Sequence, residues 1–166
     1  MTCYSPLTAW RSSGQAITFH RNRALDPTRP MKLPCGQCVG CRLDKSRQWA
    51  LRCVHEAKSH NVNCYLTLTY DNKHLPVDMS LHPEHMTKFW KRLRKKHGNG
   101  IRYFYCGEYG ERSGRPHYHA IVFGHDFDDK EVWSVKGQNT LYRSKELERL
   151  WPYGFSTIGE VTFQSA

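Results

Sequence analysis

The order of helical and extended patterns constrains the fold of this chain more than any other feature of its sequence. Apolar residues at helical spacing predict a helix over residues 43–59, and strict alternation predicts a strand over residues 63–70. Pro83 suits the start of a second amphipathic helix, and Gly98 suits its end. The later expected elements are strands over 101–108 and 117–123, a helix over 142–150 and a strand over 155–163.

This order, a helix followed by β-α-β-β-α-β, is typical of the ferredoxin-like and RRM-like arrangement. We therefore predict an α+β fold in which an antiparallel sheet carries helices on one face, with an extra N-terminal helix and a Cys-rich arm. The 166 residues are enough for one domain with a hydrophobic core. We assign this domain to residues 42–166 and the arm to residues 1–41. Scattered prolines and glycines predict an irregular arm.

Two histidines begin one of the expected strands. Residues i and i+2 of a strand point to the same face, so His117 and His119 project together, away from Tyr118. The preceding strand ends at Glu108, and a Gly-, Ser- and Arg-rich connection makes the pair a hairpin. If Glu108 lies opposite His117, the three side chains leave positions open on a catalytic Mn²⁺ or Mg²⁺, with Zn²⁺ or Fe²⁺ as alternatives. Histidine pairs in strands are also often plain polar surface, and Glu111 is a competing carboxylate.

A second candidate metal site comes from cysteines at the end of the arm. Cys35, Cys38 and Cys41 form two overlapping Cys-x-x-Cys steps, a spacing that lets thiolates surround one ion. A closed tetrahedral site needs a fourth ligand, for which Cys3 is our first choice and Cys53 the second. We expect a structural zinc that orders the arm. An iron–sulfur cluster and unliganded thiols are the alternatives.

The charge balance indicates a polyanionic partner. Lysine and arginine total 25 against 15 acidic residues, which gives a net charge of +10 and a pI of about 9.4. Cationic side chains displace counterions from phosphates, and the interleaved aromatic residues suit base stacking. A basic surface that is merely solvated is the alternative. The candidate DNA-binding residues are Arg42, Arg47, Lys91, Arg92 and Lys95, with Tyr65 and Trp90 as candidate stacking residues.

Two absences in the sequence narrow the cellular setting. No stretch of 18 apolar residues occurs, so no membrane span is predicted. The first residues lack the basic head and apolar core of a signal peptide. We therefore expect a cytoplasmic protein whose 7 cysteines are reduced or bound to metal.

These motifs resemble those of a known class of enzymes. His117-Tyr118-His119 resembles the HUH motif of single-strand endonucleases of the replication-initiator and relaxase class, and Glu108 matches the position of that class's third metal ligand. Residues 66–69 resemble its first motif. The similarity is closer to the replication initiators of small single-stranded-DNA phages, the gokushovirus group of microviruses. The phrases that carry it cover residues 34–42, 46–50, 67–70, 105–110 and 115–119.

The resemblance implies a function in rolling-circle replication. Metal-dependent nicking and joining of single-stranded DNA at an origin would use a tyrosine hydroxyl, a 5′-phosphotyrosine link and a free 3′-hydroxyl. The implied setting is the cytoplasm of a bacterial host, with the host replication machinery as a further partner. In that family the tyrosines lie on a helix after the last strand, so the nucleophile is expected beyond Ala166 and the chain is expected to be truncated. Tyr142, which with Lys145 spells Tyr-x-x-Lys, is an alternative nucleophile.

Two other functions are compatible with the sequence. A nonenzymatic RRM-like nucleic-acid-binding domain shares the β-α-β-β-α-β order, but it displays basic and aromatic residues where this chain has His117 and His119. A single-tyrosine HUH transposase has the same metal ligands but binds hairpin ends as a dimer, and the cysteine cluster argues against it. The sequence makes no prediction of the oligomeric state.

Overall fold

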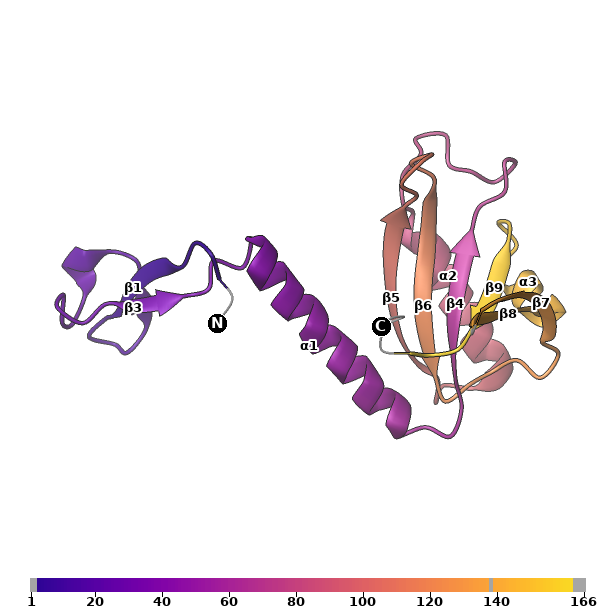
Figure 1. Cartoon of the computed structure of the whole chain (residues 1–166), viewed down its shortest axis with the longest axis horizontal. Helices are drawn as coiled ribbons and strands as arrows, with labels where there is room; N and C mark the ends of the chain where they lie inside the picture. Colours follow the sequence, from indigo (N-terminus) through magenta and orange to yellow (C-terminus); the bar gives the residue numbers. More distant parts are fainter. Residues whose placement is uncertain (1–2, 138, 163–166) are drawn as a thin grey trace. The chain divides into compact units, whose positions relative to one another are not determined.

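The computed structural model describes residues 3–137 and 139–162 of the chain. It divides into two compact units, Met1–Trp49 and Ala50–Ala166, whose elements are labelled in Figure 1. The boundary lies inside α1 (Val39–Lys58), so the two ends of this helix belong to different units. The sequence predicts the boundary at residue 42 instead. Neither α1 nor any other helix in the described ranges is both long enough and apolar enough to cross a membrane.

The N-terminal unit has more regular structure than the sequence indicates. β1 (Leu7–Arg11) pairs antiparallel with β2 (Ile17–Thr18) on one side and with β3 (Met31–Leu33) on the other, and η1 (Arg21–Arg23) is a short 3₁₀ helix. Ala9, at the centre of β1, is fully buried. The prediction of an irregular arm is therefore wrong. Such short strands show no clear period, because pairing between distant segments of the chain decides them.

The C-terminal unit contains a six-stranded antiparallel sheet in the order β5-β6-β4-β9-β8-β7. Its strands are β4 (Asn63–Thr69), β5 (Arg102–Tyr109), β6 (Pro116–Phe123), β7 (Glu131–Lys136), β8 (Asn139–Arg143) and β9 (Ser156–Gly159). With α2 (Pro83–His97) and α3 (Lys145–Leu150), strands β4, β5, β6 and β9 make the β-α-β-β-α-β unit. The predicted α+β fold with a ferredoxin-like order is confirmed.

A hairpin between β6 and α3 is the main element that the sequence analysis missed. β7 and β8 pair antiparallel across a turn at Gly137, where φ is +60°, and they extend the sheet beyond β9. The expected helix over 142–150 is therefore shorter and begins at Lys145. Ser144 fixes that start because its side chain accepts a hydrogen bond from the Leu147 amide. Phe163, the expected end of the last strand, lies outside the described residues.

One face of the sheet, called the inner face here, is covered by α2 and α3 (Figure 1). Its core contains Cys64, Leu66, Leu68 and Tyr118 from the sheet, Met86, Phe89, Trp90 and Leu93 from α2, and Leu147 and Leu150 from α3. The predicted burial of one side of β4 and of the apolar stripe of α2 is confirmed. Trp90 is 3% exposed and stacks on Tyr103 with ring centroids 3.8 Å apart, so it is a core residue and not a stacking platform for DNA.

The opposite face of the sheet, called the outer face, is covered at one end by the last part of α1. There Cys53 packs with Ile121 and Phe123 of β6, and all three side chains are buried. His117 and His119 lie earlier in the same strand and on the same face, yet they stay partly exposed. The outer face therefore has a closed apolar end and an open polar end.

Candidate metal centre on the outer face

The pairing of β5 with β6 places the three predicted metal ligands side by side. Glu108 is directly opposite His117, and Cys106 is opposite His119. Residues opposite one another in an antiparallel pair share a face, so Glu108 points the same way as both imidazoles. Tyr118, between the histidines, is 2% exposed and faces the core. The predicted alternation is confirmed, because burial of Tyr118 directs both histidines to the outer face.

The distances among these side chains suit a bound cation. Glu108 Oε2 lies 3.4 Å from His119 Nε2 and 3.8 Å from His117 Nε2. The candidate ligand atoms of the three residues all lie within 4.8 Å of one another. The histidine side chains are 17% and 23% exposed and the Glu108 side chain 56% exposed, so solvent or substrate reaches the centre. Two imidazoles and one carboxylate leave coordination positions open, as catalytic metal sites do.

Neighbouring groups fix the orientation of both imidazoles. His117 Nδ1 donates to the carbonyl oxygen of Arg115 over 3.2 Å, and His119 Nδ1 lies 3.2 Å from Thr67 Oγ1 on β4. A carbonyl oxygen only accepts, so the proton of neutral His117 is on Nδ1 and the Nε2 lone pair faces Glu108. The ring of Tyr65 stacks on His119, with centroids 5.5 Å apart. Such outer contacts are typical of metal-binding histidines.

The electrostatics keep His119 in its metal-binding form. Burial, and then the neighbouring His117, lower the pKa of His119 below the ordinary imidazole value, while Glu108 acts in the opposite direction. A lowered pKa favours the neutral imidazole, which has a free lone pair for a cation. The competing carboxylate, Glu111, is exposed in the β5–β6 turn and does not belong to this group of ligands.

Arg115 is a supporting residue that the sequence analysis did not single out. Its guanidinium donates to the carbonyl oxygen of Tyr70 through Nε (3.1 Å) and Nη2 (2.9 Å), and Nη2 also donates to Asn72 Oδ1 (2.9 Å). These contacts tie the start of β6 to the segment after β4, so Arg115 holds the strand end that carries His117. A long polar side chain just before Pro116 gave no signal, because its partners are 45 residues away.

The candidate DNA-binding residues are dispersed over the molecule. Lys91, Arg92 and Lys95 belong to α2, which covers the inner face, so the structure does not bring them to the histidines. Arg92 is partly buried and donates through Nε to the carbonyl oxygen of Leu150, which indicates a structural role. The two remaining candidates, Arg42 and Arg47, are exposed on the part of α1 that belongs to the N-terminal unit.

Tyr142, the alternative nucleophile, lies away from the metal ligands. It is on β8 and pairs with Ile158 of β9. Ile158 is 1% exposed in the core, so Tyr142 faces the inner side of the sheet, where it packs partly buried against that core. Lys130 Nζ lies 5.1 Å from the centre of its ring. The structure thus separates Tyr142 and the histidines on opposite faces.

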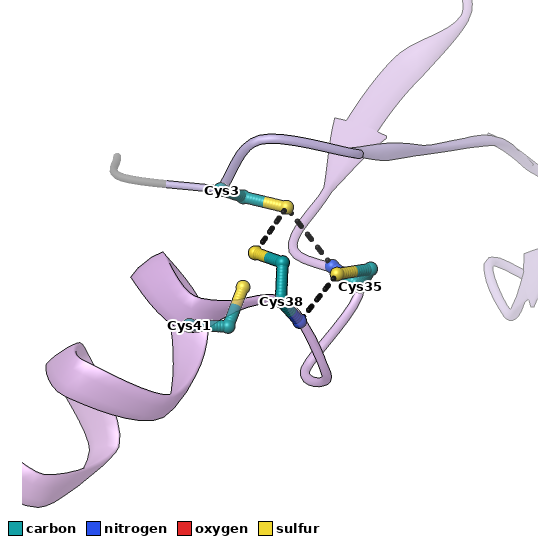
Figure 2. Close-up of side chains that lie close together, drawn as sticks. All are labelled: Cys3, Cys35, Cys38 and Cys41. Carbon is teal, nitrogen blue, oxygen red and sulfur yellow. Dashed lines mark hydrogen bonds between the residues drawn. The ribbon is translucent and has the colours of Figure 1, made fainter.

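The four cysteines chosen from the sequence come together in the N-terminal unit. Their sulfur atoms lie within 4.8 Å of one another, and the Cys38 and Cys3 sulfurs are 3.9 Å apart (Figure 2). Zinc–sulfur bonds of about 2.3 Å in a tetrahedron put sulfurs about 3.8 Å apart. The alternative ligand Cys53 is instead 4% exposed in the core beside β6.

Backbone amides around the cysteines favour thiolates. The amide of Cys35 donates to Cys3 Sγ and that of Cys38 to Cys35 Sγ (Figure 2). Hydrogen bonds from the Cys41 and Tyr4 amides lower the pKa of Cys38 to about 6, whereas burial raises the pKa of Cys41 to about 12. One thiolate is therefore favoured without an ion, and a dication would stabilise all four.

Comparison with known proteins identifies the family. Residues 63–166 match the family model of the replication-associated protein ORF2. The chain is 44% identical to Replication-associated protein ORF2 of Spiroplasma virus 4, over 81% of this chain and 45% of that protein. It is 32% identical to Replication-associated protein VP4 of Bdellovibrio phage phiMH2K, over 100% of this chain and 55% of that protein.

A third relative has the same kind of name. The chain is 37% identical to Replication-associated protein ORF4 of Chlamydia phage 1, over 78% of this chain and 35% of that protein. The chain spans about half the length, or less, of these curated relatives. No solved structure matches it. The resemblance found in the sequence motifs is confirmed: the chain belongs to the ORF2 family of phage replication-associated proteins.

Proposed function

We propose that this chain is the metal-binding part of a replication initiator that nicks and rejoins single-stranded DNA through a tyrosine nucleophile. The observation that carries the proposal is the convergence of Glu108, His117 and His119 at the open end of the outer face. The names of the relatives support a role in replication. The nicking chemistry rests on the ligand set alone.

The donor set fits Mn²⁺ or Mg²⁺, because it combines imidazoles with a hard carboxylate and leaves room for phosphate oxygens. When bound, such an ion polarises a scissile phosphate and stabilises the charge that develops on its oxygens. Glu108 supplies the compensating negative charge, and His117 and His119 set the position of the ion. Thr67 and the Arg115 carbonyl hold the two rings in place.

The surroundings of the ligands suit an unpaired strand. Tyr65 lies beside His119 on the outer face and offers an aromatic surface for a base. The net charge of +10 attracts the DNA backbone. A scissile phosphate has to approach the ligands from the open side, which a flexible single strand does more easily than a duplex.

The nucleophile completes the reaction. A tyrosine oxygen attacks the phosphorus, its proton leaves, and the bond to the 3′ oxygen breaks to give a 5′-phosphotyrosine and a 3′-hydroxyl. We place this tyrosine in the portion of the longer relatives that lies outside their match to this chain, because Tyr142 faces the inner side of the sheet.

The cysteine cluster completes the proposal. We assign Cys3, Cys35, Cys38 and Cys41 to one structural zinc ion that joins the start of the chain to the start of α1. Four thiolates close the coordination sphere, so this site has a folding role and leaves no position for substrate.

Calorimetric titration of the chain with Mn²⁺ tests the outer-face site. Mn²⁺ prefers oxygen and imidazole ligands, so the thiolates do not compete for it. We expect Glu108→Gln to weaken Mn²⁺ binding by more than about 100-fold, the upper range for residues that only hold a ligand in place. Glu111→Gln removes the same charge from the nearby turn and serves as the control. Equal effects of the two substitutions would refute the assignment.

Covalent capture tests the position of the nucleophile. Residues 1–166 should bind single-stranded DNA more tightly when Mn²⁺ is present, and they should form no protein–DNA band after denaturing electrophoresis. The full-length protein should form one. A covalent band from residues 1–166 that disappears in Tyr142→Phe would place the nucleophile on β8. Binding that is unaffected by Mn²⁺, without cleavage by the full-length protein, would support a nonenzymatic binder.

A further inference from the structure

A second cluster of two imidazoles and a carboxylate lies in the C-terminal unit, away from the proposed nicking site. His97 ends α2, His125 lies in the connection after β6, and Glu146 lies in the first turn of α3. Their candidate ligand atoms lie within 4.8 Å of one another, and the two imidazole centroids are 4.2 Å apart. No motif links them, because they are 28 and 21 residues apart in the sequence.

These side chains border a cavity of about 220 Å³. It is lined by Val62, His97, Gly124, His125, Asp126, Phe127, Asp128 and Glu146. Asp126 is engaged by Lys130 and by the amide of Phe127. Asp128 is exposed at the same cavity and adds another carboxylate. The lining therefore gathers imidazole and carboxylate donors, which is the chemistry of a cation site.

An ordinary ion-pair network accounts for part of this cluster. Glu146 Oε2 pairs with Lys96 Nζ at 2.7 Å, and Oε1 contacts His97 Nε2. These contacts leave His125 unexplained. Its Nε2 is buried and has no hydrogen-bond partner among the described residues. Buried nitrogen atoms without a partner are rare in folded proteins, and a metal ion at this position would satisfy the atom.

We propose that His97, His125 and Glu146 bind a divalent transition-metal ion of the Zn²⁺ class. Two imidazoles and one carboxylate suit Zn²⁺ better than Mg²⁺, and a water molecule or Asp128 would complete a tetrahedron. The site is separate from the outer-face centre. His97 and Glu146 belong to the two helices that cover the inner face, whereas His117 and His119 project from the outer face.

The bound ion would cross-link three elements. α3 has 6 residues, too few for a helix that is stable by itself, and it contributes Leu147 and Leu150 to the core. A metal that joins α3 to the end of α2 and to the segment after β6 would hold this helix in place. The ion therefore stabilises the side of the fold from which β9 continues.

Metal content and thermal unfolding test the proposal on the whole chain. The wild-type protein, His125→Gln and Lys96→Met would each be dialysed against Zn²⁺, and bound zinc and melting temperature would then be measured. We expect His125→Gln to lose one equivalent of zinc and the associated rise in melting temperature. Lys96→Met removes the competing ion pair but no ligand, so it should keep the full zinc content.

The control separates the metal site from the ion-pair network. If the network alone matters, Lys96→Met loses stability with or without zinc, and His125→Gln keeps its zinc content; that result would overturn the proposal. A His117→Gln variant should keep the His97 site, so failure of the outer-face proposal is distinguishable. Should His125→Gln not fold, hydrogen exchange of wild-type residues 145–150 decides. Exchange that is the same with zinc and with a chelator would also overturn the proposal.

Discussion

The cysteine cluster of the N-terminal unit and the Glu108, His117 and His119 centre of the C-terminal unit are built in opposite ways. Three of the four cysteines come from one stretch of seven residues, and the four sulfurs can enclose an ion. The outer-face centre takes its ligands from two paired strands and leaves one side open to solvent. A closed thiolate set suits a folding role, whereas an open set of hard ligands suits catalysis. Ligand type and enclosure, more than the number of candidate ligands, therefore separate the two roles.

The strongest effect is expected on the cysteine side. Cys38→Ser should abolish stoichiometric zinc and increase amide exchange across the N-terminal unit, since zinc binding contributes about 10–16 kcal/mol in small zinc-dependent folds. Metal analysis and hydrogen exchange measure both results. Cys53→Ala, which alters a cysteine outside the cluster, should keep the zinc. Full zinc content in Cys38→Ser would remove the proposed contrast between the two sites.

The two sites should also differ in their response to pH. The lowered pKa of His119 means that its neutral form persists below the ordinary imidazole value of about 6.5, so Mn²⁺ affinity should be constant above that pH. Once His119 takes up a proton, affinity should fall by about tenfold per pH unit. The raised pKa of Cys41 makes protons compete with zinc throughout the neutral range, so zinc affinity should keep rising there. Parallel pH profiles in competition titrations would contradict this difference.

A smaller effect is expected from the residue that orients His119. Thr67→Val removes the oxygen that lies 3.2 Å from His119 Nδ1 and should weaken Mn²⁺ binding by about 10–100-fold. Thr69→Val, on the same strand and face, removes a hydroxyl that donates to Phe155 O and no histidine contact. Calorimetry should show a change of less than about threefold for this control. Equal losses would mean that the threonines act on the strand and not on the ligand.

The weakest effect is expected from α2. Lys91→Ala with Lys95→Ala removes two exposed charges from a helix on the inner face, so Mn²⁺ affinity should stay unchanged. Single-stranded DNA affinity should fall only through the weaker overall field, and its salt slope should change by less than the roughly 0.7 expected for one lost phosphate contact. Fluorescence anisotropy over a range of salt concentrations measures this slope. A decrease near about 1.4, twice that value, would show that both lysines contact DNA.

Local patterns were sufficient for the elements that direct the candidate ligands. The alternation of β4 and the apolar stripe of α2 predict the buried side of each element, because burial repeats with the period of the backbone. The same alternation sends His117 and His119 to one face. Hairpin composition predicts that Glu108 lies near them, and the cysteine spacing predicts the cluster with Cys3.

The β7–β8 hairpin, the sheet in the arm and the His97, His125 and Glu146 cluster could not be read in this way. Short or exposed strands have no burial period of their own, and the pairing of β8 with β9 decides whether Tyr142 lies in a strand or a helix. The basic face of α2 looked suited to DNA, but packing on the inner face turned it away from the metal ligands.

Residue order alone was enough to set the succession of the main elements, the direction of the two histidines within β6 and the choice of cysteine ligands. These follow from backbone period and from short-range spacing, which act over a few residues. Long-range packing was needed to establish that Thr67 and Arg115 orient the histidines, that Tyr142 faces the opposite side and that His125 meets His97 and Glu146. Those contacts join residues that are 21 to 52 positions apart or depend on strand register, and pairing and packing set them across the whole unit.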